Sequence, residues 1–271
     1  MGSDDTWRPS GIVTLLSDFG STDNYVGQVK GVILGLAPQA RLIDLTHEVP
    51  PQDVLEGSFQ LATAWRAFPP GTVHLAVVDP GVGTERRAVA WIAGEHCFLT
   101  PDNGLGTLVF QQQAPEVAVV LDREEVFRRP VARTFHGRDV FAPVAARLVA
   151  GLTLDRLGTP IDPLSLVQLN IEPVRRTGTH TTGPVVSIDR FGNCRSLIGP
   201  EHLPAPPDRV LIRCGAARIR GIVPTFAAVP PGRTLALFGS HGGLEIAVRD
   251  GHAARAWDIA RGAIIEISAD G

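Results

Sequence analysis

The apolar positions along the first half of the chain follow two different periods. Short, nearly continuous apolar runs are typical of buried strands, and they occur at 12–18, 40–47, 72–79, 88–93, 96–101 and 117–122. Segments in which apolar residues recur every three or four positions are typical of helices, and they occur at 24–38, 54–68 and 140–150. Strands that alternate with helices predict an α/β domain with a largely parallel central sheet, which we place at residues 11–170.

The predicted helices are bounded by residues that favour helix ends. Asp53 and Asp139 directly precede two of them and can accept a hydrogen bond from a free backbone N–H. Gly151 follows the last one and can adopt the left-handed backbone that ends a helix. In the first helix, the spacing predicts one apolar face made of Tyr25, Val29, Val32, Ile33 and Leu36.

The pattern changes after about residue 163. Residues 171–183 are rich in turn formers, and the chain then continues in short β-type runs separated by Gly, Pro and Asp, such as GPVVSIDRFGN, RTLALFGS and GAIIEIS. Little helical periodicity remains in this part. The sequence therefore predicts a second, smaller, all-β domain over residues 175–271.

Composition narrows the class of protein. The 271 residues carry a formal net charge of −3 and no cluster of Lys or Arg, which argues against a nucleic-acid partner. Cys97, Cys194 and Cys214 are far apart, which argues against a zinc knuckle or a disulfide framework and fits a reducing cytosol. The polar start MGSDDTWRPS does not resemble a signal peptide, and no apolar run approaches the ~20 residues that span a bilayer. We expect a cytoplasmic protein that does not bind membranes.

Polar residues gather where the predicted strands end. Asp18, Asp44, His47, Asp79 and the stretch PDNG at 101–104 all occupy such positions, and ligands of open α/β sheets bind beyond the carboxyl ends of the strands. The chain lacks the phosphate-binding, nucleophile-elbow and zinc-protease motifs. These residues therefore predict a carboxylate-lined cleft without a nucleotide-binding fingerprint, and the spacing of His47, His74, His96 and His136 does not support a metal site with Asp79.

The stretch VVDPGVGTERR at 77–87 joins a buried strand to a tight turn and two arginines. The stiff Pro80-Gly81 turn can bring Arg86 back beside Asp79. Taken alone, this pair is compatible with an ion pair that only organises the loop, and His136 before a glycine is compatible with a turn residue. Arg87 is expected to be a solvated neighbour.

Several blocks of the chain resemble, in order, one known family: SDFGSTDNYVGQVKGVI, IDLTHEVPPQDV, GTVHLAVVDPGVGTERR, PDNGL, FHGRDVFAPVAA, DRFGN and SHGGLEIAV. The chain is similar to the S-adenosylmethionine hydrolases, also called SAM hydroxide adenosyltransferases, which are relatives of the bacterial fluorinase and chlorinase. The resemblance extends from about residue 11 to residue 267. It implies an α/β domain followed by a barrel-like β domain. It also implies a homotrimer in which each active site lies between the first domain of one subunit and the second domain of its neighbour.

The resemblance implies a reaction in which water or hydroxide displaces L-methionine from the 5′-carbon of S-adenosyl-L-methionine, giving adenosine. The residues that match the family's water-holding set are Asp79, Arg86 and His136. The residues that match its substrate contacts are Asp18 for the ribose hydroxyls, Phe191, Phe226 and Asn193 for the adenine, and Asp189 and Ser240 for the methionine end.

Some positions depart from the relatives. The halogenating relatives carry Tyr at the position of Asp79, and a carboxylate there repels halide. Gln52, His241 and Arg249 also differ from the residues expected in relatives, which concerns the methionine end more than the chemistry. Two alternatives stay open: an adenosyl transferase that uses halide, and a module that binds S-adenosylmethionine or adenosine as a sensor without turnover.

Overall fold

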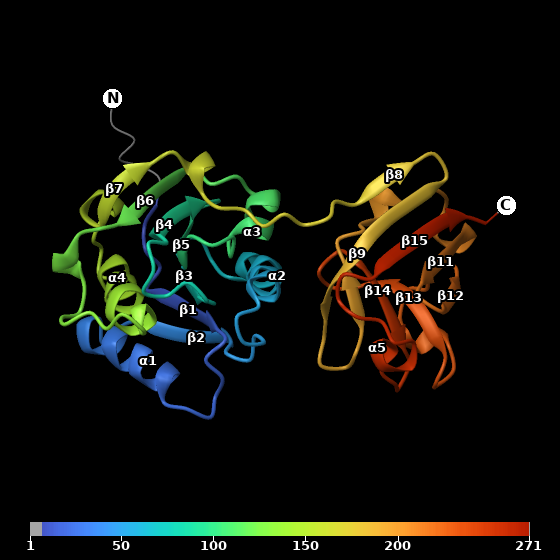
Figure 1. Ribbon diagram of the computed structural model, residues 1–271, viewed down its shortest axis with the longest axis horizontal. Helices are drawn as coiled ribbons and strands as arrows, with labels where there is room; N and C mark the ends of the chain where they lie inside the picture. Colours follow the sequence, from blue (N-terminus) through green and yellow to red (C-terminus); the bar gives the residue numbers. More distant parts are fainter. Residues whose placement is uncertain (1–6, 271) are drawn as a thin grey trace. The chain divides into compact units, whose positions relative to one another are not determined.

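The computed structural model describes residues 7–270 and divides into two compact units between Leu169 and Asn170. The ribbon in Figure 1 runs from an α/β unit, called unit 1, into a β unit, called unit 2. The first residues of the polar start considered above, 1–6, lie outside the described residues.

Unit 1 is built on one mixed sheet of seven strands in the order β2-β1-β3-β5-β4-β6-β7. Its strands are β1 (Ile12–Ser17), β2 (Arg41–Thr46), β3 (Val73–Val77), β4 (Ala88–Ala93), β5 (His96–Pro101), β6 (Val117–Leu121) and β7 (Gly158–Ile161). The pairs β1–β2, β1–β3 and β3–β5 are parallel, and only β4 and β7 run against the other strands. The predicted largely parallel sheet is confirmed.

The reversal at β4 has a local cause. Only Gly94 and Glu95 join β4 to β5, and both have positive φ. Such a two-residue turn matches the twist of a hairpin, whereas a parallel pair needs a much longer crossover. The hairpin therefore inserts an antiparallel strand into a sheet that is otherwise mostly parallel.

The helices of unit 1 are α1 (Tyr25–Leu36), α2 (Val54–Ala64), α3 (Thr107–Gln112) and α4 (Ala142–Val149). Asp53 caps α2 as expected, because its Oδ1 accepts from the backbone N–H of Glu56 at 3.0 Å. The predicted apolar face of α1 is wrong at its two ends. Val29 and Ile33 are buried, but Tyr25 and Leu36 are about half exposed. The sequence analysis did not identify α3 and β7.

The expected cap at Asp139 is also wrong. A π-helical turn over Gly137–Phe141 precedes α4, and Asp139 lies inside this turn, fully buried. Its carboxylate accepts from Arg138 Nε at 2.7 Å, from Arg128 Nη1 at 2.9 Å and from the backbone N–H of Ala132 at 2.9 Å. Burial by itself raises the pKa of Asp139, but these donors lower it to about 2. Asp139 therefore anchors the turn as a carboxylate. The predicted stop at Gly151 agrees with its φ of +97° and with the end of α4.

Unit 2 holds an eight-stranded antiparallel sheet. Seven strands follow the order β12-β11-β15-β9-β10-β14-β13, and β8 pairs with β9. The strands are β8 (Arg175–Thr177), β9 (His180–Ile188), β10 (Cys194–Ser196), β11 (Val210–Cys214), β12 (Ala217–Arg220), β13 (Thr234–Phe238), β14 (Leu244–Val248) and β15 (Ile264–Ala269), and one short helix, α5, spans Ala253–Ala256. The end strands β12 and β13 lie near each other, so the sheet almost closes around an apolar core. The predicted barrel-like β fold is confirmed.

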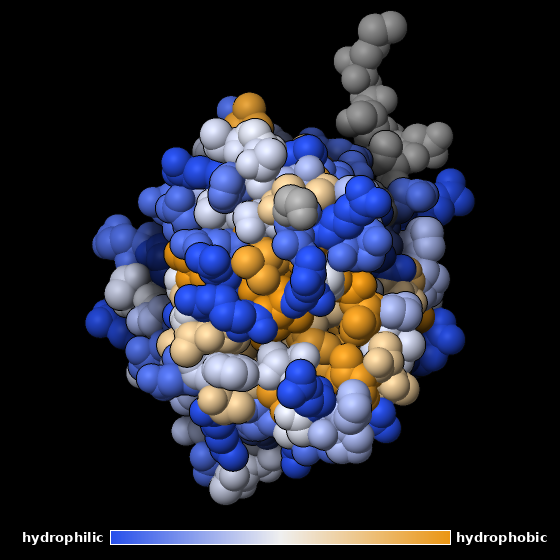
Figure 2. Space-filling model, turned by 90° about the vertical axis from the view of Figure 1, so that its right-hand side faces the viewer, coloured by the Kyte–Doolittle hydropathy of each residue, from blue (hydrophilic) through white to orange (hydrophobic). Residues whose placement is uncertain are grey.

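Apolar side chains also reach the surface of unit 2. Figure 2 shows apolar groups gathered near the middle of one face, surrounded by hydrophilic side chains. By exposure, the largest apolar residues at the surface of this unit are Phe191, Phe226 and Ile264. Among the helices of residues 7–270, none is long and apolar enough to span a membrane.

Candidate active site

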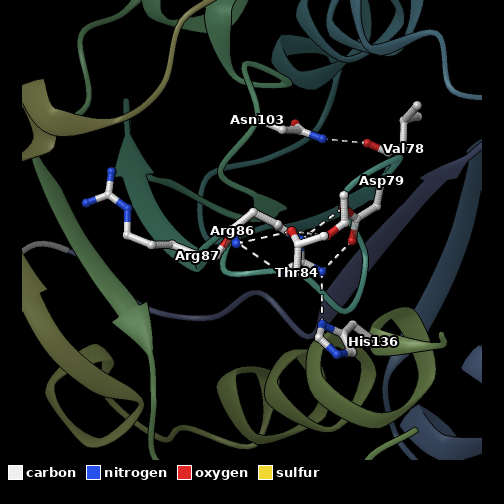
Figure 3. A network of polar contacts seen from close by, with 8 residues as sticks. Val78, Asp79, Thr84, Arg86, Arg87, Asn103 and His136 are labelled. Carbon is white, nitrogen blue, oxygen red and sulfur yellow. Dashed lines mark hydrogen bonds and ion pairs between the residues drawn. The ribbon is translucent and has the colours of Figure 1, made fainter. Parts of the chain in front are cut away.

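Asp79 and Arg86 lie on the loop that follows β3. The strand is fully buried, and the chain turns sharply after Asp79 through hydrogen bonds from Val82 N to Asp79 O at 3.2 Å and from Thr84 N to Gly81 O at 3.2 Å. Gly83 adopts a φ of +78°, and a Cβ at this position would lie 2.5 Å from the carbonyl oxygen of Arg133. The glycine therefore lets the loop fold back tightly, which returns Arg86 to Asp79 (Figure 3).

Arg86 holds Asp79 through two parallel hydrogen bonds. Its Nε donates to Asp79 Oδ1 at 2.9 Å, and its Nη2 donates to Oδ2. The side chains of Arg86 and Asp79 are only 10% and 5% exposed. A bidentate pair removed from water is stronger and more rigid than an exposed ion pair, so this loop presents a fixed carboxylate beside a fixed cation.

His136 joins the pair from the other side. Nη2 of Arg86 lies 2.9 Å from Nδ1 of His136 (Figure 3). A guanidinium only donates, so Nδ1 accepts and the proton of the neutral ring is on Nε2. Burial and the charge of Arg86 lower the pKa of His136, although Asp79 and Asp139 partly oppose them. The structure thus links the three predicted residues by hydrogen bonds, from Asp79 through Arg86 to the neutral imidazole of His136.

The π-helical turn explains how His136 reaches this place. His136 immediately precedes Gly137, whose missing side chain leaves room for the ring of Phe19 only 3.1 Å from where a Cβ would be. The buried Asp139 ties the turn to Arg128 and Arg138. Arg138 and Asp139 are therefore structural, and Asp139 acts through the turn rather than as the helix cap that the sequence analysis expected.

Arg87 is not a solvated neighbour. Its Nε donates to the buried Asp102 at 2.7 Å, and its Nη2 donates to the carbonyl of Ser165 at 2.6 Å. A further contact was missed: Asn103 Nδ2 donates to the carbonyl of Val78 at 2.8 Å, directly before Asp79 (Figure 3). The hairpin register carried the signal for the contact of Arg87 with Asp102, because pairing of β4 with β5 places the residue before β4 beside the residue after β5. Parallel pairing of β3 with β5 likewise brings together Val78 and Asn103, which follow these two strands.

Asp18 lies at the same edge of the sheet as Asp79. It follows β1, and the parallel register pairs Ser17 with Val77. Its Oδ2 accepts from the backbone N–H of Gln52 at 2.8 Å, while Gln52 itself has a φ of +66°. One oxygen of Asp18 thus orders the loop before α2, and its contacts within residues 7–270 leave the other oxygen available for a ligand.

In unit 2, five predicted residues line one pocket of about 440 Å³. The pocket is lined by Asp189, Phe191, Asn193, Pro224, Thr225, Phe226, Leu237, Phe238, Gly239, Ser240 and Glu245. Three aromatic rings, an amide, two hydroxyls and two carboxylates suit a planar base linked to a polar or charged group. The sequence analysis did not identify Glu245.

The pocket loop 189–193 is held by Asp189. Its Oδ1 accepts from the backbone N–H groups of Phe191 and Asn193, both at 2.9 Å, and its Oδ2 accepts from Asn193 Nδ2 at 2.9 Å. Gly192 has a φ of +85° and packs against the ring of His252. These bonds hold the turn in place and leave the ring of Phe191 72% exposed in the lining of the pocket.

Phe226 is held in a similar way. It begins a short 3₁₀ turn that Thr225 caps, with Oγ1 accepting from Ala227 N at 3.0 Å. Arg249 donates from Nη1 to the carbonyl of Val229 at 2.7 Å, at the end of the same turn. Arg249 therefore supports the turn that carries Phe226. Within the described part of the chain, no group of three or more His, Cys, Asp or Glu side chains is placed to hold a metal ion.

Two family models match the chain. They are described as the SAM hydroxide adenosyltransferase N-terminal domain, which matches residues 13–158, and the SAM hydroxide adenosyltransferase C-terminal domain, which matches residues 183–266. Together they match most of both units and include every site residue predicted from the sequence.

Individual proteins give a consistent result. A protein of Salinispora tropica named (R)-S-adenosyl-L-methionine hydrolase is 39% identical over 265 residues, which is 96% of this chain and 99% of the relative. A fluorinase of an Actinoplanes species is more distant, with 29% identity over 67% of this chain and 70% of the relative. Among solved structures, an uncharacterized conserved protein of Thermotoga maritima matches with a TM-score of 0.89 and 36% identity, over 94% of this chain and 99% of its own.

Proposed function

Because the chain belongs to the SAM hydroxide adenosyltransferase family, we propose that it hydrolyses S-adenosyl-L-methionine to adenosine and L-methionine with water held by Asp79, Arg86 and His136. The observation that carries this proposal is the bonded chain from Asp79 through Arg86 to His136. A loop-organising ion pair requires only the first two residues. The neutral imidazole at the end of the chain adds a polar group that the loop itself does not need.

The reaction requires little from the protein beyond correct positioning of the attacking water. The oxygen of water forms a bond to the 5′-carbon as the bond from that carbon to sulfur breaks, and the electron pair of the broken bond stays on sulfur. Methionine therefore leaves as a neutral thioether and needs no proton, while the attacking water loses one. Holding the oxygen in line with the breaking bond, about 3–3.5 Å from the carbon, supplies much of the rate. We expect no requirement for a metal or an organic cofactor.

The three residues divide this task by their charges. Asp79 accepts a hydrogen bond from the water. This bond orients the water so that a lone pair of the water oxygen points towards the 5′-carbon. Arg86 favours the hydroxide-like charge that develops as the proton leaves. His136 accepts from Arg86 at Nδ1 and carries its proton on Nε2, so it offers the water a donor. The water proton leaves by way of Asp79, the anionic member of the set.

The remaining predicted residues are proposed to bind the substrate. Asp18 accepts from the ribose hydroxyls, for which a carboxylate is suited. Phe191 and Phe226 stack beside the adenine, and Asn193 contacts its edge; all three line the pocket of unit 2. Asp189 and Ser240 line the same pocket, and their proposed role is to contact the methionine end. The relative's name specifies the (R) configuration, so the sulfonium epimer used by this chain is to be tested directly.

The division of these groups between the two units supports a proposal for the assembly. The water-holding residues belong to unit 1 and the adenine pocket belongs to unit 2. We infer a homotrimer, as in the family, in which neighbouring subunits complete each other's sites. The buried and unpaired Cys97, Cys194 and Cys214 support a reducing, cytoplasmic location.

Chromatography of the products tests the function. Each sulfonium epimer is incubated separately with purified protein, in EDTA and with either low or high chloride. We expect adenosine and methionine in equal amounts and no dependence on chelation. Formation of 5′-chloro-5′-deoxyadenosine would establish the halide-using alternative. Tight binding of the substrate without products would establish the sensor. Asp79 argues against the first, because a carboxylate fixed by Arg86 repels halide.

A further inference from the structure

The pocket of unit 2 has an uneven charge. Its lining contains the two carboxylates of Asp189 and Glu245, and none of the described lining residues is Lys, Arg or His. A concave, partly apolar site strengthens the field of such groups because it excludes water. The pocket therefore favours a ligand that brings a positive charge along with its ring.

Asp189 is the less available of the two carboxylates. Three N–H donors of its own loop already use both of its oxygens, namely Phe191 N, Asn193 N and Asn193 Nδ2. The negative charge of Asp189 is therefore already stabilised by the N–H groups of its own turn. A ligand cation gains more from a carboxylate whose oxygens are not committed to backbone groups.

Glu245 fits this description. It lies in β14, where Leu244 and Ile246 face the core, so Glu245 faces the other side of the strand, opposite Leu237 of β13 in register. Its carboxylate lies over Gly239, at a place where a Cβ would come within 2.0 Å of Oε1. The glycine thus makes room for the acid at the pocket wall, and the side chain is 10% exposed.

His241 holds Glu245 from behind the pocket wall. Its Nδ1 lies 3.3 Å from Glu245 Oε1, and its Nε2 lies 3.1 Å from the carbonyl oxygen of Ser196. A carbonyl oxygen only accepts, so Nε2 carries a proton. The ring therefore lies between Glu245 Oε1 and the backbone of β10, and its position fixes that of Oε1. Oε2 makes no hydrogen bond within residues 7–270 that competes with a ligand.

We propose that Glu245 is a specificity-determining residue that binds the α-ammonium group of the substrate's amino-acid end, and that His241 is its positioning residue. The proposal rests on the function proposed above and deepens it, because it names the group that distinguishes an S-adenosyl amino acid from a plain nucleoside. The cross-strand neighbour Arg195 directs its Nη2 to Ser187 and does not line the pocket.

The test uses three stable probes that are not cleaved: S-adenosyl-L-homocysteine, its analogue without the α-amino group, and adenosine. Their dissociation constants are measured by calorimetry for the wild type, for Glu245→Gln and for Glu266→Gln, a matched change at an exposed position of the same unit. A hydrogen bond to a charged group contributes about 1.5–3 kcal/mol. We therefore expect Glu245→Gln to weaken S-adenosyl-L-homocysteine about 10- to 100-fold, with the other two probes unchanged.

Each other outcome overturns the proposal. If Glu245→Gln weakened the binding of all three probes equally, Glu245 would only maintain the structure of the pocket. If the dissociation constant of S-adenosyl-L-homocysteine did not change, Glu245 would not take part in recognising the ligand. In wild-type protein, equal affinity for S-adenosyl-L-homocysteine and its deaminated analogue would have the same meaning. His241→Phe is expected to raise KM for the substrate with kcat nearly unchanged; a fall in kcat alone would reject its positioning role. Failure of the proposed function is recognised separately, as absence of adenosine in the product assay.

Discussion

Arg86 donates to Nδ1 of His136 across 2.9 Å while it also holds both oxygens of Asp79. The guanidinium thus fixes the tautomer of the imidazole, because a ring nitrogen that accepts from a cation cannot also carry a proton. Protonation of His136 at Nδ1 breaks this contact and places two positive charges together. The arrangement is therefore complete only when the ring is neutral.

This relationship predicts the acid limb of the pH profile. Burial and the charge of Arg86 lower the pKa of His136 from its ordinary value of 6.5. The ring is neutral above its lowered pKa and charged below it, so kcat/KM should stay level as pH falls through 6.5 and decline only further into acid. The profile between pH 4.5 and 8 measures this, since kcat/KM reports the free enzyme. In His136→Gln the activity should be low and this decline absent. A decline centred above pH 6.5 would contradict the assignment.

A second prediction separates the two adjacent arginines. Arg86→Lys keeps a charge but loses the two parallel bonds to Asp79 and the contact with His136. Loss of a group that acts on the reacting water costs on the order of 10²–10⁴-fold in kcat, with little change in the affinity for adenosine. Arg87→Lys is the matched control, because Arg87 binds Asp102 and Ser165 instead. It should lower the melting temperature and leave kcat of the folded protein near wild type. Equal kcat values for the two variants would show that the pair at Arg86 only organises the loop.

Periodicity along the chain was sufficient to predict most of the fold. The strand at 96–101 coincides with β5, and Asp53 caps α2 as expected, since both depend on local patterns. The π-helical turn was not predictable in this way. Asp139 precedes an apolar helix as a cap would, but Arg128 and the backbone N–H of Ala132 from the preceding segment, together with the adjacent Arg138, hold its carboxylate inside the turn.

The site shows the same division. Asp79 and Arg86 are seven residues apart around a stiff turn, so their meeting is local, and the resemblance added His136. Glu245 was not found, because a glutamate in an apolar strand gives no sign of which face it occupies. Its place depends on the register of β14 with β13 and on the space above Gly239. Arg87 was misjudged for a similar reason, since Asp102 reaches it only through the hairpin pairing.

A third prediction concerns stability in acid. His74 is buried between Thr14 Oγ1 at 2.7 Å and Nδ1 of His96 at 3.0 Å. Burial and the neighbouring His96 lower its pKa from 6.5 to about 3. The unfolded chain therefore binds this proton below pH 6.5 while the folded chain does not, so stability falls as pH decreases from 6.5 towards 3. Between pH 7.5 and pH 5 this one residue should remove about 2 kcal/mol from the free energy of unfolding.

Urea unfolding at pH 7.5 and pH 5 measures this loss. His74→Gln should lose about 2 kcal/mol less than the wild type over the same interval, whatever its stability at pH 7.5. His180→Gln is the control, because His180 is exposed. This variant should lose as much free energy of unfolding between pH 7.5 and pH 5 as the wild type. If His74→Gln and the wild type lost equal stability, the buried pair would not be the source of the acid sensitivity.

The last prediction tests whether sites are shared between subunits. Asp79→Ala removes a water-holding residue of unit 1, and Asn193→Ala removes an adenine contact of unit 2, so each chain alone should be nearly inactive. If each site takes unit 1 from one subunit and unit 2 from its neighbour, a trimer assembled from both variants contains some sites with two intact halves. Random mixing of equal amounts makes roughly a quarter of the sites intact. Activity should then rise to about that fraction of wild type after the two variants are unfolded and refolded together. If each chain instead builds its own site, every site carries one defect whatever the mixture, and no activity returns.

A chain carrying both substitutions, refolded with wild type, is the control. It should also leave roughly a quarter of the sites intact in shared assemblies, but one half if each chain works alone. Light scattering on the same samples shows whether the active species is a trimer.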